Sequence, residues 1–227
     1  MSCKTKELLD LSHSLAGKYF EQKEYPWQIL PIIGDIIIDI ISLLSKEEYR
    51  EVSKDIYIHK SAKVSPSAFI GGPCIIGPNT EIRHGAFIRN RAMIGANCVI
   101  GNSCEIKNAI VFDDVQVPHF NYVGDSILGY HSHMGAGAVA SNVKADKSPI
   151  KVRDGLIVIE TNLDSFGTIL GDYVEVGCNS VLNPGTIVGR GSTIYPLSSV
   201  RGVIAPNCIY KTKDNIVEKQ DMDSKER

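Results

Sequence analysis

The sequence predicts an all-β fold, a parallel β-helix with a small two-helix cap at its N-terminal end. Aliphatic residues recur every six positions over most of the chain, and small residues recur at a fixed offset from them. Ile and Val together number 47 against 13 Leu, a bias that favours strands. Seven of those Leu lie within the first 44 residues, so the N-terminal part is expected to be built differently from the rest.

The six-residue period is the main signal. It fits neither a helix nor an open strand, whereas a short strand followed by a tight turn has this length. The first run of anchors is Ile58, Val64, Ile70, Ile76, Ile82, Ile88, Ile94, Ile100 and Ile106, and the second is Leu170, Val176, Leu182, Val188, Ile194 and Val200. Val117, Val123, Leu128 and Met134 continue the period between the two runs.

Each unit is expected to direct its anchor into a narrow interior with a small residue beside it. Three units make a triangular turn, and about six or seven turns are expected to stack roughly 4.8 Å apart, so that backbone groups pair between turns. Gly or Asn is expected at turn positions with positive φ. Cys74, Cys98 and Cys104 occupy the small interior position, where cysteine is a compact apolar residue.

The flanks complete the predicted architecture. Residues 1–55 form an N-terminal cap and linker, with amphipathic or buried helices over 5–22 and 27–45. We expect these helices to cover the open end of the solenoid, which otherwise exposes unpaired strand edges, and an oligomer contact is the alternative.

The β-helix itself is expected over residues 56–212. Residues 141–169 lose the period, which predicts a loop excursion containing a short hairpin, typically on the functional side of a solenoid. Residues 213–227 make a charged tail that is expected to fray.

Composition excludes several classes of protein. With 43% hydrophobic residues, 22% charged residues and a net charge of −2, the chain is neither disordered nor a strongly basic nucleic-acid binder. Its most apolar run, residues 29–44, is too short and too charged to span a bilayer. The N-terminus lacks the apolar core of a signal peptide, and no CxxC occurs. A cytoplasmic protein with reduced thiols is expected, with neither nucleic acid nor membrane as a partner.

Residues 117–147 carry specific motifs. They contain "HFNYVGD", then "GAG", then Asn142, and histidine is the natural general base near neutral pH. With the repeat, these motifs resemble the hexapeptide-repeat acyltransferases. The similarity is to the acetyltransferase domain of bifunctional N-acetylglucosamine-1-phosphate uridyltransferase/glucosamine-1-phosphate N-acetyltransferase, and to the β-helix domain of glucose-1-phosphate thymidylyltransferase-like proteins. It covers about residues 58–212 and implies a left-handed β-helix.

The resemblance implies a role for each matching residue. His119 falls on the catalytic base, and Asp125 is expected either to orient it or to be structural. The implied substrate-binding residues are Arg89, Lys107, Tyr122, His133, Asn142 and Lys147. The implied residues for acetyl-CoA, the co-substrate, are Ala136, Cys178, Pro196 and Lys213. His133, Cys178 and Pro196 replace a family Asn, Ser and Ala, and no metal is expected.

The implied function is acetyl-CoA-dependent N-acetyl transfer to an amino-sugar 1-phosphate such as glucosamine-1-phosphate, in a homotrimer that feeds nucleotide-sugar (UDP-N-acetylglucosamine) synthesis. No nucleotidyltransferase domain is expected, since only about 57 residues precede the repeat. One alternative is a non-catalytic trimeric scaffold or regulatory subunit. A minor alternative is a γ-carbonic-anhydrase-like zinc protein that uses His84 and His119, with His131 and His133 as an HxH pair.

Overall fold

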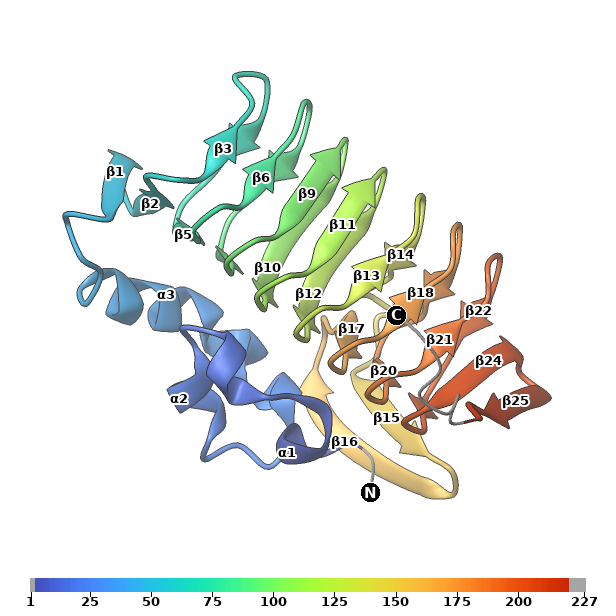
Figure 1. Ribbon diagram of the computed structural model, residues 1–227. Coiled ribbons are helices and arrows are strands. Elements are labelled where there is room, and N and C mark those ends of the chain that lie inside the picture. The colour runs from blue at the N-terminus through green and yellow to red at the C-terminus, as the bar shows by residue number, and fades with distance from the viewer. Residues whose placement is uncertain (1–2, 221–227) are drawn as a thin grey trace.

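The structure, a computed structural model that describes residues 3–220, is a β-solenoid with a short N-terminal helical region (Figure 1). The predicted β-helix is therefore confirmed. It has about nine turns, more than the six or seven that the anchors predict. The period continues beyond the last anchor, because Ile204 and Tyr210 are still buried in the interior.

Each turn of the chain adds one strand to each of three parallel faces. The first face contains β2 (Ile56–His59), β5 (Cys74–Ile76), β8 (Ala92–Ile94), the ends of β10 (Glu105–Val111) and β12 (Tyr122–Leu128), β17 (Thr168–Leu170), β20 (Thr186–Val188) and β23 (Val203–Ile204). The second face contains β3 (Lys63–Val64), β6 (Glu81–Ile82), β9 (Val99–Asn102), β11 (Gln116–His119), β13 (His133–Met134), β18 (Glu175–Val176), β21 (Thr193–Ile194) and β24 (Cys208–Thr212). The third face contains β4 (Phe69–Ile70), β7 (Phe87–Ile88), the starts of β10 and β12, β14 (Val139–Ala140), β19 (Val181–Leu182) and β22 (Ser199–Val200).

The interior follows the predicted register. The anchors from Ile76 onwards are buried, and only Val64 and Ile70, in the first turn, are partly covered. Cys74, Cys98 and Cys104 are fully buried, and burial raises the pKa of the Cys74 and Cys98 thiols to about 12. All three therefore behave as apolar packing residues.

The glycines after the anchors serve close approach between turns, whereas positive φ was expected of them. A Cβ on Gly101 would lie 1.5 Å from the Pro118 carbonyl oxygen of the next turn, and one on Gly77 would lie 2.5 Å from the Gly95 oxygen. Positive φ occurs instead at turn residues such as Asn79 and Asn97. At these positions glycine is required by the short distance between turns, and not by positive φ as the sequence predicted.

A short hairpin covers one face of the solenoid at each end. At the N-terminal end, β1 (Tyr49–Ser53) pairs antiparallel with β2. At the other end, β25 (Asn215–Glu218) pairs antiparallel with β24, so the predicted frayed tail is wrong for this part, and residues 221–227 lie outside the described residues. Each added strand satisfies the backbone groups of an edge that would otherwise be unpaired.

The N-terminal region runs along the side of the solenoid, and the prediction that it covers an open end is wrong (Figure 1). Its elements are α1 (Thr5–Leu8), η1 (Leu11–His13), α2 (Gly17–Phe20), η2 (Pro26–Ile32) and α3 (Ile33–Ile41). α3 contacts β5, β8 and β10, and η2 contacts β12, all on the first face.

An apolar ladder on the outside of the first face explains this position. The central residues of its three-residue strands point outward and align from turn to turn, and all are almost fully buried. They are Ile75, Met93, Ile110, Ile127, Ile169 and Ile187. The N-terminal segment removes the earlier part of this ladder from water, and loss of apolar surface to water is the dominant favourable contribution to such packing.

The predicted continuous helix over 5–22 breaks into three short pieces. Backbone groups there bond to the solenoid and to local side chains: the Asp10 amide donates to the Asp172 carboxylate at 2.7 Å, and the Asp172 amide donates to the Leu8 carbonyl at 3.0 Å. The Asp10 carboxylate also accepts from the Ser12 amide at 3.1 Å. Such bonds compete with helical pairing. Over the predicted helix 27–45, Pro31 lacks an amide hydrogen, and regular helix begins only at Ile33.

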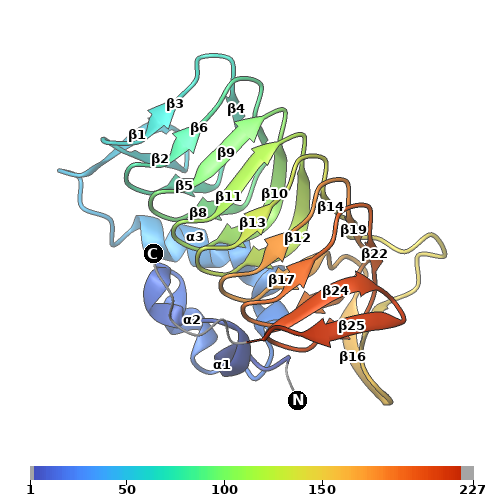
Figure 2. The same cartoon turned by 45° about the vertical axis from the view of Figure 1, so that its right-hand side comes forward.

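The excursion forms a hairpin that lies beside the later turns (Figure 2). β15 (Ile150–Asp154) pairs antiparallel with β16 (Ile157–Leu163), and β15 contacts β23. Ile150 and Val152 are buried against the solenoid. The first face is thus covered by the N-terminal segment along its earlier turns and by this hairpin along its later ones. In the described part of the chain, no helix is long and apolar enough to cross a membrane.

Ile88 offers a test of the register, because it is fully buried on the third face. We expect Ile88→Ala to lower the free energy of unfolding by about 2–5 kcal/mol, as a large-to-small change in a packed interior. Ile157→Ala, on the exposed side of the hairpin, is the control and should cost less than about 0.5 kcal/mol. Urea unfolding measures both, and equal effects would contradict the assigned interior.

Candidate active site

His119 belongs to a column of residues that stack at the corner between the second and third faces. In this register, His119 pairs with Asn102 in one neighbouring turn, and Gly137 donates its amide to the His119 carbonyl at 3.0 Å from the other. Asn179 donates to the Ala136 carbonyl, and Leu197 donates to the Cys178 carbonyl. We call this set the His119 column: His119, Ala136, Cys178 and Pro196. The turns that carry it stand in a row in Figure 1.

The His119 column brings together residues that are far apart in the sequence. It joins the predicted base to three of the four residues expected to contact acetyl-CoA. Successive members lie one turn apart, so the column extends over about 14 Å. His119, Cys178 and Pro196 are exposed, and Ala136 is half-buried. Lys213 immediately follows Thr212, which is the next position of the column in the last turn.

A buried polar cluster occupies the corner between the third and first faces. The Asp125 carboxylate accepts from the Asn108 side-chain amide at 2.8 Å, pairs with the Lys107 ammonium at 3.1 Å, and accepts from the Asn142 side-chain amide. The Asp125 side chain is only 5% exposed. We call these residues, with Tyr122, the Asp125 cluster.

The Asp125 cluster also joins separate parts of the chain. Asn108 donates to the Leu30 carbonyl of the N-terminal segment at 3.2 Å. At the end of the excursion, Phe166 donates its amide to the Asn142 carbonyl at 2.9 Å, and Gly167 donates its amide to the Asp125 carbonyl at 2.8 Å. The cluster therefore fixes both the N-terminal segment and the return of the excursion.

Tyr122 connects this cluster with the middle of the third face. Its hydroxyl donates to the Asn142 side-chain oxygen at 3.4 Å. Burial, and then the nearby Asp125 and Glu105 carboxylates, raise the pKa of Tyr122, so the phenol remains a neutral donor at physiological pH. The third face thus has the His119 column along one edge and the Asp125 cluster on the other, and Tyr122 is the member of the cluster that lies nearest the middle of the face.

Two basic residues of the implied substrate-binding set, Arg89 and Lys107, both have carboxylate partners. Arg89 and Lys107 occupy equivalent positions in adjacent turns, as their spacing predicts. Arg89 pairs with Glu105 at 3.0 Å and Lys107 with Asp125. Arg89 uses one guanidinium nitrogen for this pair and is 46% exposed, which leaves donors available to an anion.

The structure does not bring every predicted residue to the same place. The carboxylate of Asp125 bonds within the Asp125 cluster, and the imidazole of His119 has no hydrogen bond within residues 3–220. Of the two roles expected for Asp125, orienting His119 or holding the structure, the second is the one observed. His133 lies on the second face, where its ring bonds to Glu175 at 2.8 Å. Lys147 is exposed in a turn of the excursion, with only a backbone bond to Lys144.

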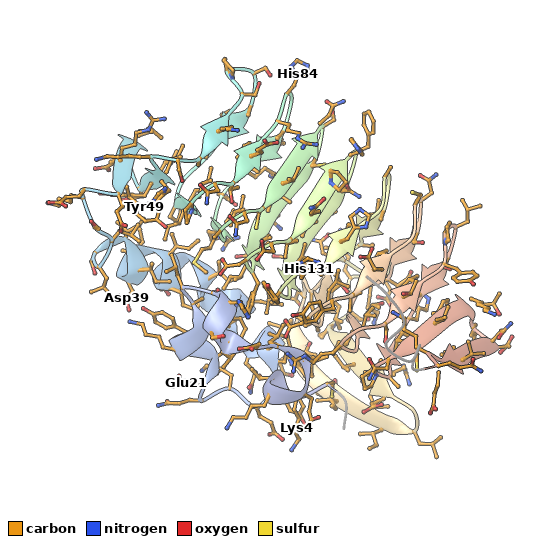
Figure 3. The ribbon with its side chains drawn as sticks, in the orientation of Figure 1. Lys4, Glu21, Asp39, Tyr49, His84 and His131 are labelled. Atoms are coloured by element: carbon orange, nitrogen blue, oxygen red, sulfur yellow. The ribbon has the colours of Figure 1, made fainter. Side chains whose placement is uncertain are left out.

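The histidines of the zinc alternative are dispersed. Figure 3 shows His84 at the outer tips of the turns and His131 on the opposite side, near the N-terminal segment. His84 bonds to Ser67 at 2.7 Å, and His131 lies beside the Tyr173 ring at 5.5 Å between centroids. His131 precedes its strand with φ of 55°, so it does not share a face with His133. Among residues 3–220, no group of three or more His, Cys, Asp or Glu could hold a metal ion.

Two partners of the predicted residues were missed from the sequence, Asn108 in the Asp125 cluster and Glu105 beside Arg89. Asn108 and Glu105 both contact the predicted substrate residues or their partners. A usable signal was their spacing: Asn108 lies 17 residues before Asp125, and Glu105 lies 16 after Arg89. Such intervals, close to one complete turn, place side chains side by side in a solenoid of this period.

Comparison with known proteins identifies the family. The model of the family described as the GMPPB C-terminal domain matches residues 72–201. This is more than half of the chain. The protein belongs to that family. The predicted relationship to hexapeptide-repeat proteins is thereby confirmed.

The individual relatives that match have low sequence identity with this chain. The chain is 28% identical over 205 residues to the bifunctional protein GlmU of Methanococcus maripaludis, an alignment covering 89% of this chain and 50% of that protein. It is 26% identical to the uncharacterized acetyltransferase YaiX of Escherichia coli, covering 86% of this chain and 90% of that one. A solved structure, the UDP-N-acetylglucosamine acyltransferase of Campylobacter jejuni, is 18% identical with a TM-score of 0.35, covering 67% of this chain and 70% of that one. The chain spans half or less of the length of the bifunctional relatives of this kind.

The buried charge of Asp125 gives a prediction for stability. Asp125→Ala leaves Lys107 without its carboxylate and two amide side chains without an acceptor, so we expect a loss of about 3–5 kcal/mol in the free energy of unfolding. Glu105→Ala breaks the more exposed pair with Arg89 and should cost less than about 1 kcal/mol. Urea unfolding of both variants checks this, and similar losses would show that Asp125 is not a buried partner.

Proposed function

We propose that this protein is an acetyl-CoA-dependent N-acetyltransferase acting on an amino-sugar 1-phosphate. The observation that carries the proposal is the His119 column, in which an exposed histidine heads a line of exposed and half-buried residues along one corner, and its imidazole has no hydrogen-bond partner within residues 3–220. The relationship to proteins named as acetyltransferases supports it. The column provides an extended track beside a general base.

The proposed reaction is direct acyl transfer. The imidazole of His119 takes a proton from the substrate ammonium, and the amine attacks the thioester carbonyl carbon. A C–N bond forms and the C–S bond breaks. The nitrogen loses its second proton to the departing thiolate of coenzyme A, and the imidazolium of His119 releases the first proton to water. Positioning of the two substrates supplies much of the rate enhancement, so no covalent enzyme intermediate is required. The backbone amide of Ala136, one turn from His119, is the proposed donor to the developing oxyanion.

The acceptor is proposed to lie across the third face. Tyr122 and Asn142 offer neutral hydrogen-bonding groups for sugar hydroxyls, and the free donors of Arg89 suit a phosphate. Lys107 contributes positive charge at the same corner while held by Asp125. Within this proposal, His133 and Lys147 reach the acceptor only from a neighbouring subunit or after movement of the excursion.

We further propose a homotrimer, because the third face lacks a cover within the described residues. Its outward ladder exposes Phe69, Phe87 and Val181 by 57%, 40% and 38%. Beside the His119 column, Phe120 and Leu197 are 60% and 79% exposed, at positive φ that bulky residues rarely adopt. A second copy packed here would bury these side chains and turn the open face into a cleft.

The first functional prediction concerns the base. His119→Ala should lower kcat for acetyl transfer by about 10²–10⁴-fold, because the amine loses its proton acceptor. His84→Ala is the matched control, since His84 is an exposed histidine two turns away at the same corner. Arg89→Ala should instead raise KM for the sugar phosphate with a smaller change in kcat. Transfer of labelled acetyl from acetyl-CoA measures all three.

Two outcomes of that assay would count against the assignment. An unchanged rate in His119→Ala would move the base elsewhere. Absence of acetyl transfer by the parent protein to every amino-sugar phosphate tested would favour the non-catalytic scaffold.

The trimer has its own test. Light scattering of the parent protein should give about three times the chain mass of 24.8 kDa. Phe87→Glu should shift the mass towards the single chain, since a charge on this face would be buried without a partner. Ile157→Glu, an exposed position on the hairpin, should leave the mass unchanged. A parent protein that is monomeric at micromolar concentration would contradict the proposal.

A further inference from the structure

Two adjoining cavities lie between the excursion and the later turns of the solenoid. The larger, of about 420 Å³, is lined by Ser141, Asn183 and Val143 among others, and the smaller, of about 200 Å³, is lined by residues of β15. Both are lined by Lys144, Pro184 and Arg201. Residues that line the larger cavity flank Asn142 in the sequence, so the pair of cavities continues from the Asp125 cluster towards the C-terminal end.

The smaller cavity is lined by four cations and no carboxylate. They are Lys144, Lys151, Arg153 and Arg201. Lys144 pairs with Asp146 at 3.7 Å and Lys151 with Glu160 at 2.7 Å, so these two are largely neutralised. Neither Arg153 nor Arg201 has an ion pair within residues 3–220. Two uncompensated guanidinium groups thus line one small space.

Packing of the hairpin against the solenoid holds this arrangement in place. Ile150 and Val152 of β15 are buried, on either side of Lys151 and next to Arg153. β15 passes so close to the solenoid that a Cβ on Gly202 would lie 2.9 Å from the Arg153 carbonyl oxygen. Gly202 adopts φ of 78°, which only glycine takes without strain. The two arginines therefore approach each other from segments that the fold fixes.

We propose that Arg153 and Arg201 form a binding site for the phosphate or diphosphate group of a small organic molecule. Guanidinium groups present paired donors that match phosphate oxygens. The smaller cavity is below the size of ordinary ligand pockets, which suits a phosphate group, and the larger cavity has room for the organic part of the molecule. This site is separate from Arg89 and Lys107, and it does not depend on acetyl transfer.

The test measures binding of inorganic pyrophosphate by titration calorimetry at physiological ionic strength. Arg153→Gln and Arg201→Gln should each weaken binding about 10-fold or more, since each removes a charge-assisted contact. Both side chains are exposed, so folding should be retained, as thermal unfolding can check. Arg83→Gln is the matched control, an exposed arginine on the second face that is paired with Glu81, and should bind pyrophosphate within about twofold of the parent.

Competition then distinguishes the sources of the phosphate. Displacement of pyrophosphate by coenzyme A assigns the site to the co-substrate, and displacement by glucosamine-1-phosphate assigns it to the acceptor; both uphold the site. Absence of binding to the parent protein at millimolar pyrophosphate overturns it. So does unchanged affinity in Arg153→Gln and Arg201→Gln, or binding that is lost only in Arg89→Gln. Because no turnover is measured, these outcomes are independent of whether the protein transfers acetyl groups.

Discussion

Hydrogen bonds between successive turns hold this molecule together. They all run along the axis of the solenoid, and most of the other features of the structure follow from that direction. Every strand of an interior turn has a neighbour above and below, so its backbone groups are satisfied without help from the rest of the protein. The two terminal turns have a neighbour on one side only. The hairpins β1–β2 and β24–β25 supply a partner strand on one face at each end, part of the role that the sequence prediction assigned to helices, whereas β3, β4, β22 and β23 each keep a single strand neighbour.

The same pairing explains why functional side chains gather in columns. Since each turn repeats the geometry of the last, residues separated by roughly one turn of chain lie one above the other. Arg89 and Lys107 stack at one corner, and His119, Ala136, Cys178 and Pro196 stack at another. An exposed column offers a linear track for an extended molecule, whereas a buried one such as the Asp125 cluster offers a fixed anchor. The third face lies between the two.

The interior could be predicted from the sequence because a narrow prism accepts few residue types. Ile88, Cys74 and the other interior positions repeat with one period, and the stacking of Arg89 on Lys107 follows from the same count. The six-residue period did not predict which segments cover the outside of the first face. Ile75 and Met93 follow their interior neighbours directly and face outward, and their pairing with α3 depends on chain segments distant in the sequence. Side-chain partners could not be predicted either. One expected role of Asp125 was to orient His119, but its buried carboxylate instead contacts Lys107 and the side-chain amides of Asn108 and Asn142.

The N-terminal segment has a consequence for how the protein unfolds. In a simple solenoid each turn touches only its neighbours, so terminal turns can fray independently and cooperativity is limited. Here the N-terminal segment crosses several turns. The backbone amides of Asp113 and Asp172 donate to the His13 and Leu8 carbonyls, and the side-chain amide of Asn108 donates to the Leu30 carbonyl. Turns that never meet in the repeat are thereby fastened to a common element. We therefore expect the turns that the N-terminal segment spans to unfold together, since a break in any one of them also loosens contacts several turns away.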